Sequence, residues 1–200
     1  MPLKKQVVNT LIPAFILIFQ NGLIHAQGEE AFDSLEIGWQ YVMNVNRNLF
    51  HDFYQPGSGF EGFAEMPFYY GDIQIAIQAL SYSAVNRDRT QDFEGIFTHL
   101  KWGKKYRLLY GVRWFTGIGV GFNAFLPRQR ALPELAHFTE TELSVGLNTH
   151  FSYPIHKNWT VRISGDYNYI FTYKPIQLAY FSTGIGYSFD TPKWLKGFLE

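Results

Sequence analysis

The stretch YRLLYGVRWFTGIGVGFNAF, from Tyr106 to Phe125, decides the fold class. Its even positions are apolar or aromatic apart from Thr116, whereas its odd positions include two arginines, four glycines and Asn123. Side chains on a β-strand alternate between two faces, so one face of this stretch is continuously apolar and the other is largely polar. A helix would mix the two sets at a period of 3.6 residues. The stretch is therefore expected to form one long strand.

The same period of two recurs along most of the chain. With the first stretch it gives seven strands, the other six being Leu35–Tyr41, Ile73–Gln78, Ile96–Trp102, Thr141–Tyr153, Trp159–Tyr173 and Leu178–Phe189. Single-chain bacterial barrels have an even number of strands. The eighth strand is therefore expected within the irregular stretch Asn46–Met66.

The composition favours a sheet with one face in lipid. Aromatic residues make up 18% of the chain and charged residues only 17%, below the roughly 25% of soluble domains. The polar face is rich in Gly, Ser, Asn and Gln, which suit a narrow lumen. The apolar face includes tyrosine and tryptophan side chains, as lipid-facing surfaces do. These features predict an all-β fold, an antiparallel up-and-down transmembrane β-barrel. A soluble secreted or periplasmic barrel that binds an apolar ligand alternates too, and it stays open as an alternative.

Charge balance and cysteine content exclude several classes of protein. The chain has 17 acidic and 17 basic residues, so it has no net positive charge that would favour nucleic acid as a partner. The chain has no cysteine, which rules out disulfides, thiolate metal sites and cysteine nucleophiles. The six histidines show no metal-ligand spacing. The sequence therefore predicts neither a metal nor a cofactor.

The N-terminus has the three-part plan of an export signal. Lys4 and Lys5 precede an apolar run, Val7–Phe19, and Ala26 is a suitable last residue before cleavage. An uncleaved membrane anchor is the alternative, but the run is shorter than the roughly 20 residues that a helical span needs. Residues 1–26 are expected to be a signal peptide, and residues 27–189 the barrel.

The lengths of the connections orient the barrel. Short links are expected at Gly103–Lys105 and Pro154–Asn158, and in bacterial barrels the short turns face the periplasm. Longer connections at 85–92, 126–138 and 172–177 then face the cell surface. Outward aromatic residues beside the short links and at the end of the last strand predict a periplasmic girdle of Trp102, Tyr106, Tyr153, Trp159, Tyr187 and Phe189.

Charged residues also occur on the inward face. They are expected to form a buried ion-pair network that fills the lumen, made of Glu36, Lys101, Arg107, Arg113, Glu142, Arg162 and Asp166. A path for an ion or small solute is the alternative reading. Eight strands, however, enclose a lumen that side chains alone can fill.

The final strand carries a family resemblance. Tyr180–Phe189, YFSTGIGYSF, ends in outward aromatic residues at a spacing of two, and together with the export signal it resembles the small, eight-stranded outer-membrane barrels of Gram-negative bacteria. In those families such a strand is recognised by the barrel-assembly machinery, so the resemblance implies that partner, outer-membrane lipid and a location in the cell outer membrane. The resemblance is one of architecture and selects no single family.

This chain departs from that pattern by continuing past Phe189. Thr191-Pro192 is expected to start a short helix within residues 190–200, and Trp194 and Phe198 are among the apolar residues that would lie on one of its sides. We expect a short amphipathic tail on the periplasmic membrane interface. The alternative is a docking handle for a protein partner in the envelope.

One arrangement resembles a hydrolase. His150-Phe-Ser152 places a histidine and a serine on one face of a strand, and acyloxyacyl-hydrolase-type lipid A deacylases carry His-x-Ser-Asn on a similar barrel. Here Tyr153 stands in place of the asparagine, and the pair points inward near the periplasmic rim. The sequence therefore favours a non-enzymatic, porin-like barrel that serves envelope integrity, surface interaction or an envelope complex. His150 and Ser152 remain candidates for the hydrolase alternative.

Overall fold

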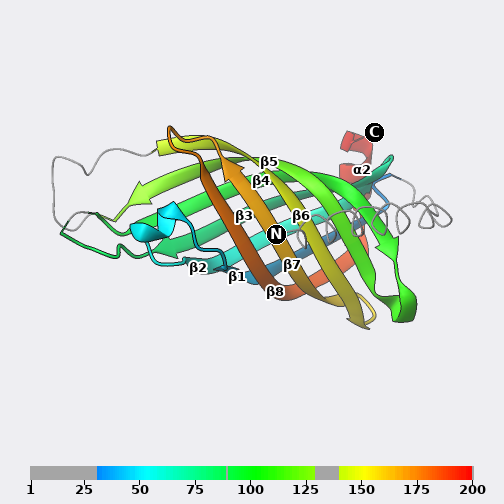
Figure 1. Cartoon of the computed structure of the whole chain (residues 1–200). Helices are drawn as coiled ribbons and strands as arrows, with labels where there is room; N and C mark the ends of the chain where they lie inside the picture. Colours follow the sequence, from blue (N-terminus) through cyan, green and yellow to red (C-terminus); the bar gives the residue numbers. More distant parts are fainter. Residues whose placement is uncertain (1–30, 89, 129–139, 200) are drawn as a thin grey trace, which may run out of the picture.

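The computed structural model describes residues 31–88, 90–128 and 140–199, and these form one closed antiparallel barrel (Figure 1). Each strand pairs with the next along the chain, and the last strand closes the sheet by pairing with the first. The strands are β1 Ser34–Asn44, β2 Ser58–Phe68, β3 Gly71–Tyr82, β4 Phe93–Arg107, β5 Arg113–Pro127, β6 Glu140–His156, β7 Trp159–Ile170 and β8 Ile176–Asp190. The expected eight-stranded, up-and-down barrel is confirmed. The expected signal peptide lies outside the described residues.

Strand β2 supplies the eighth strand, inside the stretch that the sequence left unassigned. Its inward side chains include Glu61, Phe63 and Glu65, which are buried, whereas Phe60 faces outward. The connection before β2 holds a short 3-10 helix, η2 (Leu49–Asp52). The irregular pattern of Asn46–Met66 therefore reflects a connection and a strand in succession.

The expected turn at Gly103–Lys105 is wrong, and Tyr106–Phe125 is not one strand. Strand β4 continues to Arg107, the chain turns through the 3-10 helix η3 (Leu109–Gly111), and β5 begins at Arg113. Tyr110 and Gly111 make the turn with φ angles of 59° and 78°. Six positions separate Arg107 from Arg113, an even number, so the alternation of faces continues across the turn without a break.

Gly103 serves packing inside β4. A Cβ atom at this position would lie 2.3 Å from the backbone oxygen of Thr116 and 2.7 Å from the ring of Phe115. The glycine therefore leaves room for the buried Phe115 ring in the lumen.

The three short connections lie at one end of the barrel. They are Tyr69-Tyr70, Leu108–Val112 and Lys157-Asn158, and the start of β1 and the end of β8 lie at the same end. The link expected at Pro154–Asn158 is shorter than predicted, because β6 extends to His156. The remaining connections lie at the opposite end; residues 45–57 and 83–92 are longer, 171–175 are as many as Leu108–Val112, and most of 126–138 lies outside the described residues.

The helix α2 (Lys193–Leu199) follows β8 directly. The backbone nitrogens of Leu195 and Lys196 donate to the Pro192 oxygen at 2.9 and 3.0 Å, so the helix starts where the sequence predicts. Lys196 Nζ lies 2.5 Å from Asp33 Oδ1, just before β1. Among the described residues, no helix is long and apolar enough to cross a membrane.

An aromatic and aliphatic layer fills the lumen at the end with the long connections. Its hydroxyl groups are paired, because Tyr82 Oη and Tyr180 Oη lie 2.9 Å apart. Phe50 and Tyr54, from the β1–β2 connection, pack against it from above. The buried members of this aromatic layer are Val42, Leu80, Tyr82, Phe93, Phe97, Ile170, Leu178 and Tyr180.

Polar contacts hold η2 over this layer. His51 Nε2 lies 2.5 Å from Asn44 Oδ1, and Asn48 caps the 3-10 helix by accepting from the Phe50 backbone nitrogen at 3.0 Å. Asn46 Nδ2 donates to the Gln177 backbone oxygen at 2.8 Å, which ties the connection to β8. The β1–β2 connection is thus folded over the mouth of the barrel.

We predict that η2 loosens at acidic pH. Burial lowers the pKa of His51 below 6.5, and Arg47 lowers it further, so the closed conformation favours the neutral imidazole. A group with a lowered folded-state pKa contributes stability that is complete above its unfolded pKa and is lost as the pH falls through the folded pKa. Hydrogen-exchange protection of the amides of His51, Phe53 and Tyr54 should therefore fall as the pH is lowered below 6.5.

His51→Gln is the control, because glutamine keeps a hydrogen-bonding side chain but does not titrate. Its protection factors should be lower than those of the wild-type chain at neutral pH and almost flat with pH. An equal fall in protection in the His51→Gln variant would show that another group causes the opening.

Candidate functional site in the barrel lumen

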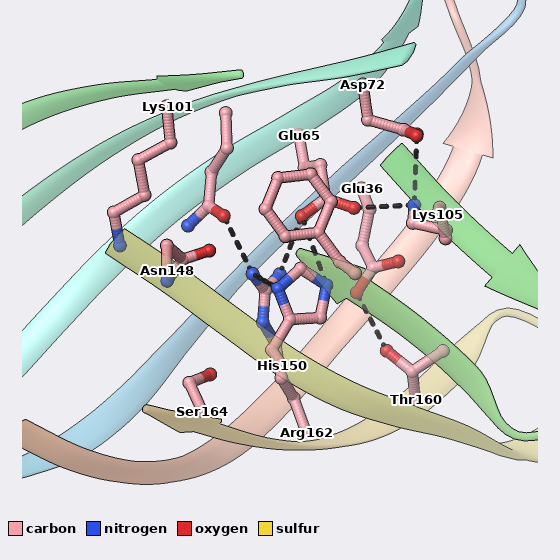
Figure 2. A network of polar contacts seen from close by, with 12 residues as sticks. Glu36, Glu65, Asp72, Lys101, Lys105, Asn148, His150, Thr160, Arg162 and Ser164 are labelled. Carbon is pink, nitrogen blue, oxygen red and sulfur yellow. Dashed lines mark hydrogen bonds and ion pairs between the residues drawn. The ribbon is translucent and has the colours of Figure 1, made fainter. Parts of the chain in front are cut away.

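Below the aromatic layer the lumen is polar, and Glu65 is its most connected acid (Figure 2). Its carboxylate lies 3.0 Å from Arg162 Nη1 and 2.5 Å from Lys105 Nζ. Lys105 also reaches Asp72 Oδ1 at 3.2 Å. Strands β2, β3, β4 and β7 each contribute to this cluster, so it joins opposite walls of the barrel.

Arg162 is almost completely buried and uses much of its donor capacity. Beyond Glu65, its Nη2 donates to Gln74 Oε1 at 2.7 Å and lies 2.6 Å from His150 Nδ1. Its guanidinium carbon also lies 4.2 Å from the centre of the Phe63 ring. A buried guanidinium is tolerated only with such partners, because removing it from water without them costs several kcal/mol.

A second cluster lies between the first and the aromatic layer. Lys101 Nζ is 2.7 Å from Asp166 Oδ1 and 3.7 Å from Glu61 Oε2. Glu61 accepts from the side-chain amides of Gln40 and Gln78 at 2.5 and 2.6 Å. Both acids and the lysine are buried, so this cluster also links strands across the lumen.

The structure buries four of the seven predicted network residues in the lumen, and two of these four, Lys101 and Asp166, contact each other. Lys101 pairs with Asp166, Arg162 pairs with Glu65, and Glu36 accepts from Thr160 Oγ1 at 3.0 Å. The other three lie at the ends of the barrel. Arg107 and Arg113 face each other beside the β4–β5 turn, and Glu142 lies near the start of β6.

Sequence reasoning missed four charged members, Glu61, Glu65, Asp72 and Lys105. The first two lie in the stretch that was left unassigned, and Lys105 lies in the segment that was taken for a turn. The alternation of Glu61, Phe63 and Glu65 against Phe60 was the signal that could have found the two acids.

His150 and Ser152 both point into the lumen, with exposed fractions of 1% and 3%. The His150 ring stacks on Phe115 at 4.7 Å, and its Nε2 lies 3.5 Å from Glu65. Its Nδ1 faces Arg162, so both ring nitrogens face charged groups of the network. This geometry fits a lumen-filling histidine, and it gives no lipid chain access to the pair.

The six aromatic residues predicted for the girdle share the outward parity of their strands. Trp159 packs edge-to-face on Tyr187, with ring centres 5.0 Å apart, and Tyr106 lies beside Trp114 at 5.5 Å. The corrected turn moves Trp102 away from the β4–β5 turn, because it pairs in register with Ile118. The assignment of these residues to a membrane interface stays a prediction.

The arrangement is that of a packed interior. Charged side chains from opposite walls meet in pairs in its lower part, and the aromatic layer fills its upper part. The described residues contain no group of three or more His, Asp or Glu side chains arranged to hold a metal ion. The polar contacts in this part of the lumen are ion pairs and hydrogen bonds between strands.

Solved structures with a similar fold are small bacterial barrels. Neisserial surface protein A (NspA) aligns with a TM-score of 0.55 and 15% identity, over 80% of this chain and 100% of that chain. The outer membrane protein OprG from Pseudomonas aeruginosa aligns with a TM-score of 0.54 and 9% identity, over 80% and 97% of the two chains. This chain has the fold of a small outer-membrane β-barrel. No protein-family model and no curated protein sequence matches it.

We predict that Glu65→Gln destabilises the barrel strongly. The substitution removes the only charge partner of Arg162 within ion-pair distance among the described residues, and leaving a buried charge unpaired costs about 3–5 kcal/mol. The matched control is Glu94→Gln, whose Arg128 partner is half exposed, and which should cost less than about 1 kcal/mol. Urea unfolding of both variants in phospholipid vesicles measures the difference, and similar losses would contradict a supporting role for the lumen network.

Proposed function

We propose that this chain is a non-enzymatic barrel of the bacterial outer membrane that acts at the cell surface and neither transports solutes nor catalyses a reaction. The observation that carries the proposal is the filled lumen. Eight strands enclose a space that side chains can fill, and here two charged clusters and an aromatic layer occupy it in succession.

The lipid-facing surface supports the location. Side chains such as Ile118, Phe122 and Leu147 point away from the barrel and lie more than half exposed, whereas polar side chains fill the lumen. A soluble protein would have the reverse distribution, with apolar side chains inside and polar side chains outside. Exposed apolar surfaces of this extent bind a partner or a membrane. Short turns face the periplasm in bacterial barrels, so we assign the end with the short turns to the periplasm and the opposite end to the cell surface.

The surface connections support a role in surface interaction. The β1–β2 and β3–β4 connections pair through a bridge between Tyr54 and Ala84, and the Val85 nitrogen donates to the Phe53 oxygen at 2.8 Å. This ordered pair of connections exposes Leu49, Phe53 and Val85 to solvent. Ordered, exposed apolar side chains at a loop end are typical of recognition surfaces.

The proposal predicts a folded barrel without a conducting pore. The chain, refolded in detergent, should migrate differently on SDS gels with and without boiling, and in planar lipid bilayers it should give no discrete conductance steps. A triple substitution of Phe93, Phe97 and Tyr82 by Ala opens the aromatic layer and should raise the conductance. Discrete steps from the unmodified chain would overturn the non-conducting assignment, and migration that boiling does not change would overturn the barrel assignment.

For the C-terminal tail we propose a place on the periplasmic membrane interface. Trp194 and Phe198 share one side of α2 and are 74% and 82% exposed, while Lys196 ties the helix to Asp33 at the barrel rim. An interfacial helix buries such an apolar side among lipid headgroups.

Brominated lipids test this placement of the tail. Bromine near the headgroup should quench the fluorescence that Trp194 contributes, obtained as the difference between the wild-type chain and Trp194→Phe. The same difference for Trp39→Phe, on the outer wall of β1, provides the reference for a tryptophan deeper in the bilayer. No headgroup quenching of Trp194 would place the tail in solution.

A further inference from the structure

Two buried histidines on the barrel strands point into the lumen, and their surroundings differ. His150 has both ring nitrogens beside charged groups, Arg162 Nη2 at 2.6 Å and Glu65 Oε2 at 3.5 Å. His99 is 3% exposed, and neither of its ring nitrogens has a hydrogen-bond partner among the described residues. A neutral imidazole carries one donor and one acceptor, and leaving both unpaired in a buried position is costly. The His99 ring is therefore expected to bind something that is not part of the chain.

The three strands that follow His99 also carry buried polar atoms without a hydrogen-bond partner in the part of the chain that the structure describes. These atoms are Asn123 Oδ1 on β5, Ser144 Oγ and Asn148 Oδ1 on β6, and Asp166 Oδ2 and Asn168 Nδ2 on β7. Strands β4 to β7 pair in that order, so the atoms belong to one continuous wall of the lumen.

Glycines in β5 and β6 let two of these side chains lie flat against the wall. A Cβ atom on Gly121 would lie 2.3 Å from His99 Cδ2 and 3.0 Å from His99 Nε2, so the imidazole covers Gly121. A Cβ atom on Gly146 would lie 2.4 Å from Asn168 Oδ1, so the Asn168 amide covers Gly146. Gly121 is the register partner of His99, and Gly146 is the register partner of Asn168. His99 therefore leans from β4 over β5, and Asn168 leans from β7 over β6, toward each other.

Ser144 lies between these two side chains. It is the register partner of Gly121 and lies two residues from Gly146 on the inward face of β6. Cβ positions are about 5 Å apart in directly opposed residues and about 6.6 Å apart at positions i and i+2 of a strand. The Ser144 Cβ thus lies within about 9 Å of both His99 Nε2 and Asn168 Oδ1. One or two water molecules span such a gap, because each hydrogen bond covers about 2.8 Å.

The donors and acceptors of the wall determine what it can bind. Asn168 Nδ2 only donates, Asp166 Oδ2 only accepts, and the Ser144 hydroxyl does both. The other Asp166 oxygen is already compensated, because Lys101 Nζ lies 2.7 Å from it and Asn148 Nδ2 lies 2.5 Å from it, side by side in Figure 2. The Lys101 charge disfavours a metal cation and the Asp166 charge disfavours an anion. Water pairs with donors and acceptors alike, and a buried water needs two to four such partners.

The wall is closed toward both ends of the barrel. Phe97, which is completely buried in the aromatic layer, lies beside His99 with ring centres 6.5 Å apart. On the side of the short turns, the ion pairs of Glu65 with Arg162 and Lys105 fill the lumen. The residues that carry the unpaired atoms are at most 5% exposed, so bulk solvent does not reach them.

We propose that His99, Ser144 and Asn168 bind a small cluster of ordered water molecules that is enclosed in the lumen. We call these three residues the hydration site. The waters complete the hydrogen bonds that the three side chains do not make with the protein, and they extend to Asp166 Oδ2. The site goes beyond the proposed function and does not depend on a membrane location. It makes the middle of the lumen wet but sealed, between the aromatic layer and the Glu65 network.

NMR spectroscopy of the chain, refolded in detergent micelles with labelled histidine, tests the hydration site directly. Nuclear Overhauser contacts should connect the water resonance with the ring protons of His99. His150 is the internal control, because it is equally buried but its ring nitrogens face protein groups, and it should show no such contact. The absence of a water contact at His99, or equal contacts at both rings, would overturn the proposal.

A matched pair of serine variants tests the site through stability. Ser164 Oγ donates to Gln40 Oε1 at 2.9 Å, so Ser164→Ala loses a hydrogen bond and should lower the urea midpoint of unfolding by about 0.5 M. Ser144→Ala should lower the midpoint by a similar amount, because its hydroxyl loses bound water. A buried hydroxyl without any partner is destabilising instead. An unchanged or raised midpoint in Ser144→Ala would therefore show that the site is dry.

A crystal of the refolded chain soaked in rubidium chloride separates water from a bound cation. Electron density within hydrogen-bond distance of His99 and Ser144, without an anomalous rubidium signal, is the expected result. A rubidium peak beside Asp166 Oδ2 would replace the waters by a monovalent cation and overturn the proposal.

Discussion

The structure depends on the closure of its hydrogen-bonded sheet. In a hydrocarbon environment every backbone donor and acceptor needs a protein partner, so a sheet that crosses a membrane cannot leave an open edge. Strand β1 pairs with β8 along the whole length of β1, from Ser34 opposite Asp190 to Asn44 opposite Tyr180. Once the sheet is closed with eight strands, the radius is fixed, and the inward side chains must fill a narrow space.

That narrow space explains the composition of the inward face. Large aromatic rings occupy one half of it, and in the other half glycines leave room for rings and long charged side chains that meet from opposite walls. Buried ion pairs add little net stability compared with apolar packing, but they are costly to break singly. They therefore favour one arrangement of the walls over others, as the contacts of Arg162 with β2, β3 and β6 illustrate.

The fold was largely predictable from the sequence, because alternation is a direct consequence of strand geometry. The prediction of strand boundaries failed at the β4–β5 turn, because the alternation of apolar and polar residues continues through that turn. Arg107 and Arg113 both point inward, and the apolar residues between them continue the pattern, so nothing but Gly111 marked the turn. The network was predictable only in part. The alternation of residues identifies which charged side chains point inward. It does not identify their partners, because the pairing of Arg162 with Glu65 depends on which strands face each other across the lumen. That arrangement is set by the radius of the barrel and the stagger of its strands.

The reach of these lumen contacts along the chain has a consequence for assembly. Arg162 and Glu65 are 97 residues apart in sequence, and Tyr82 and Tyr180 are 98 residues apart. Neither pair can meet in a growing, open sheet, because their strands lie on opposite walls. Until β8 pairs with β1, a charge such as Arg162 lacks its partner on the opposite wall and must keep water around it. Pairing of β8 with β1 therefore completes these cross-lumen contacts in the same step, whereas contacts between neighbouring strands, such as Gln78 with Glu61, can form earlier.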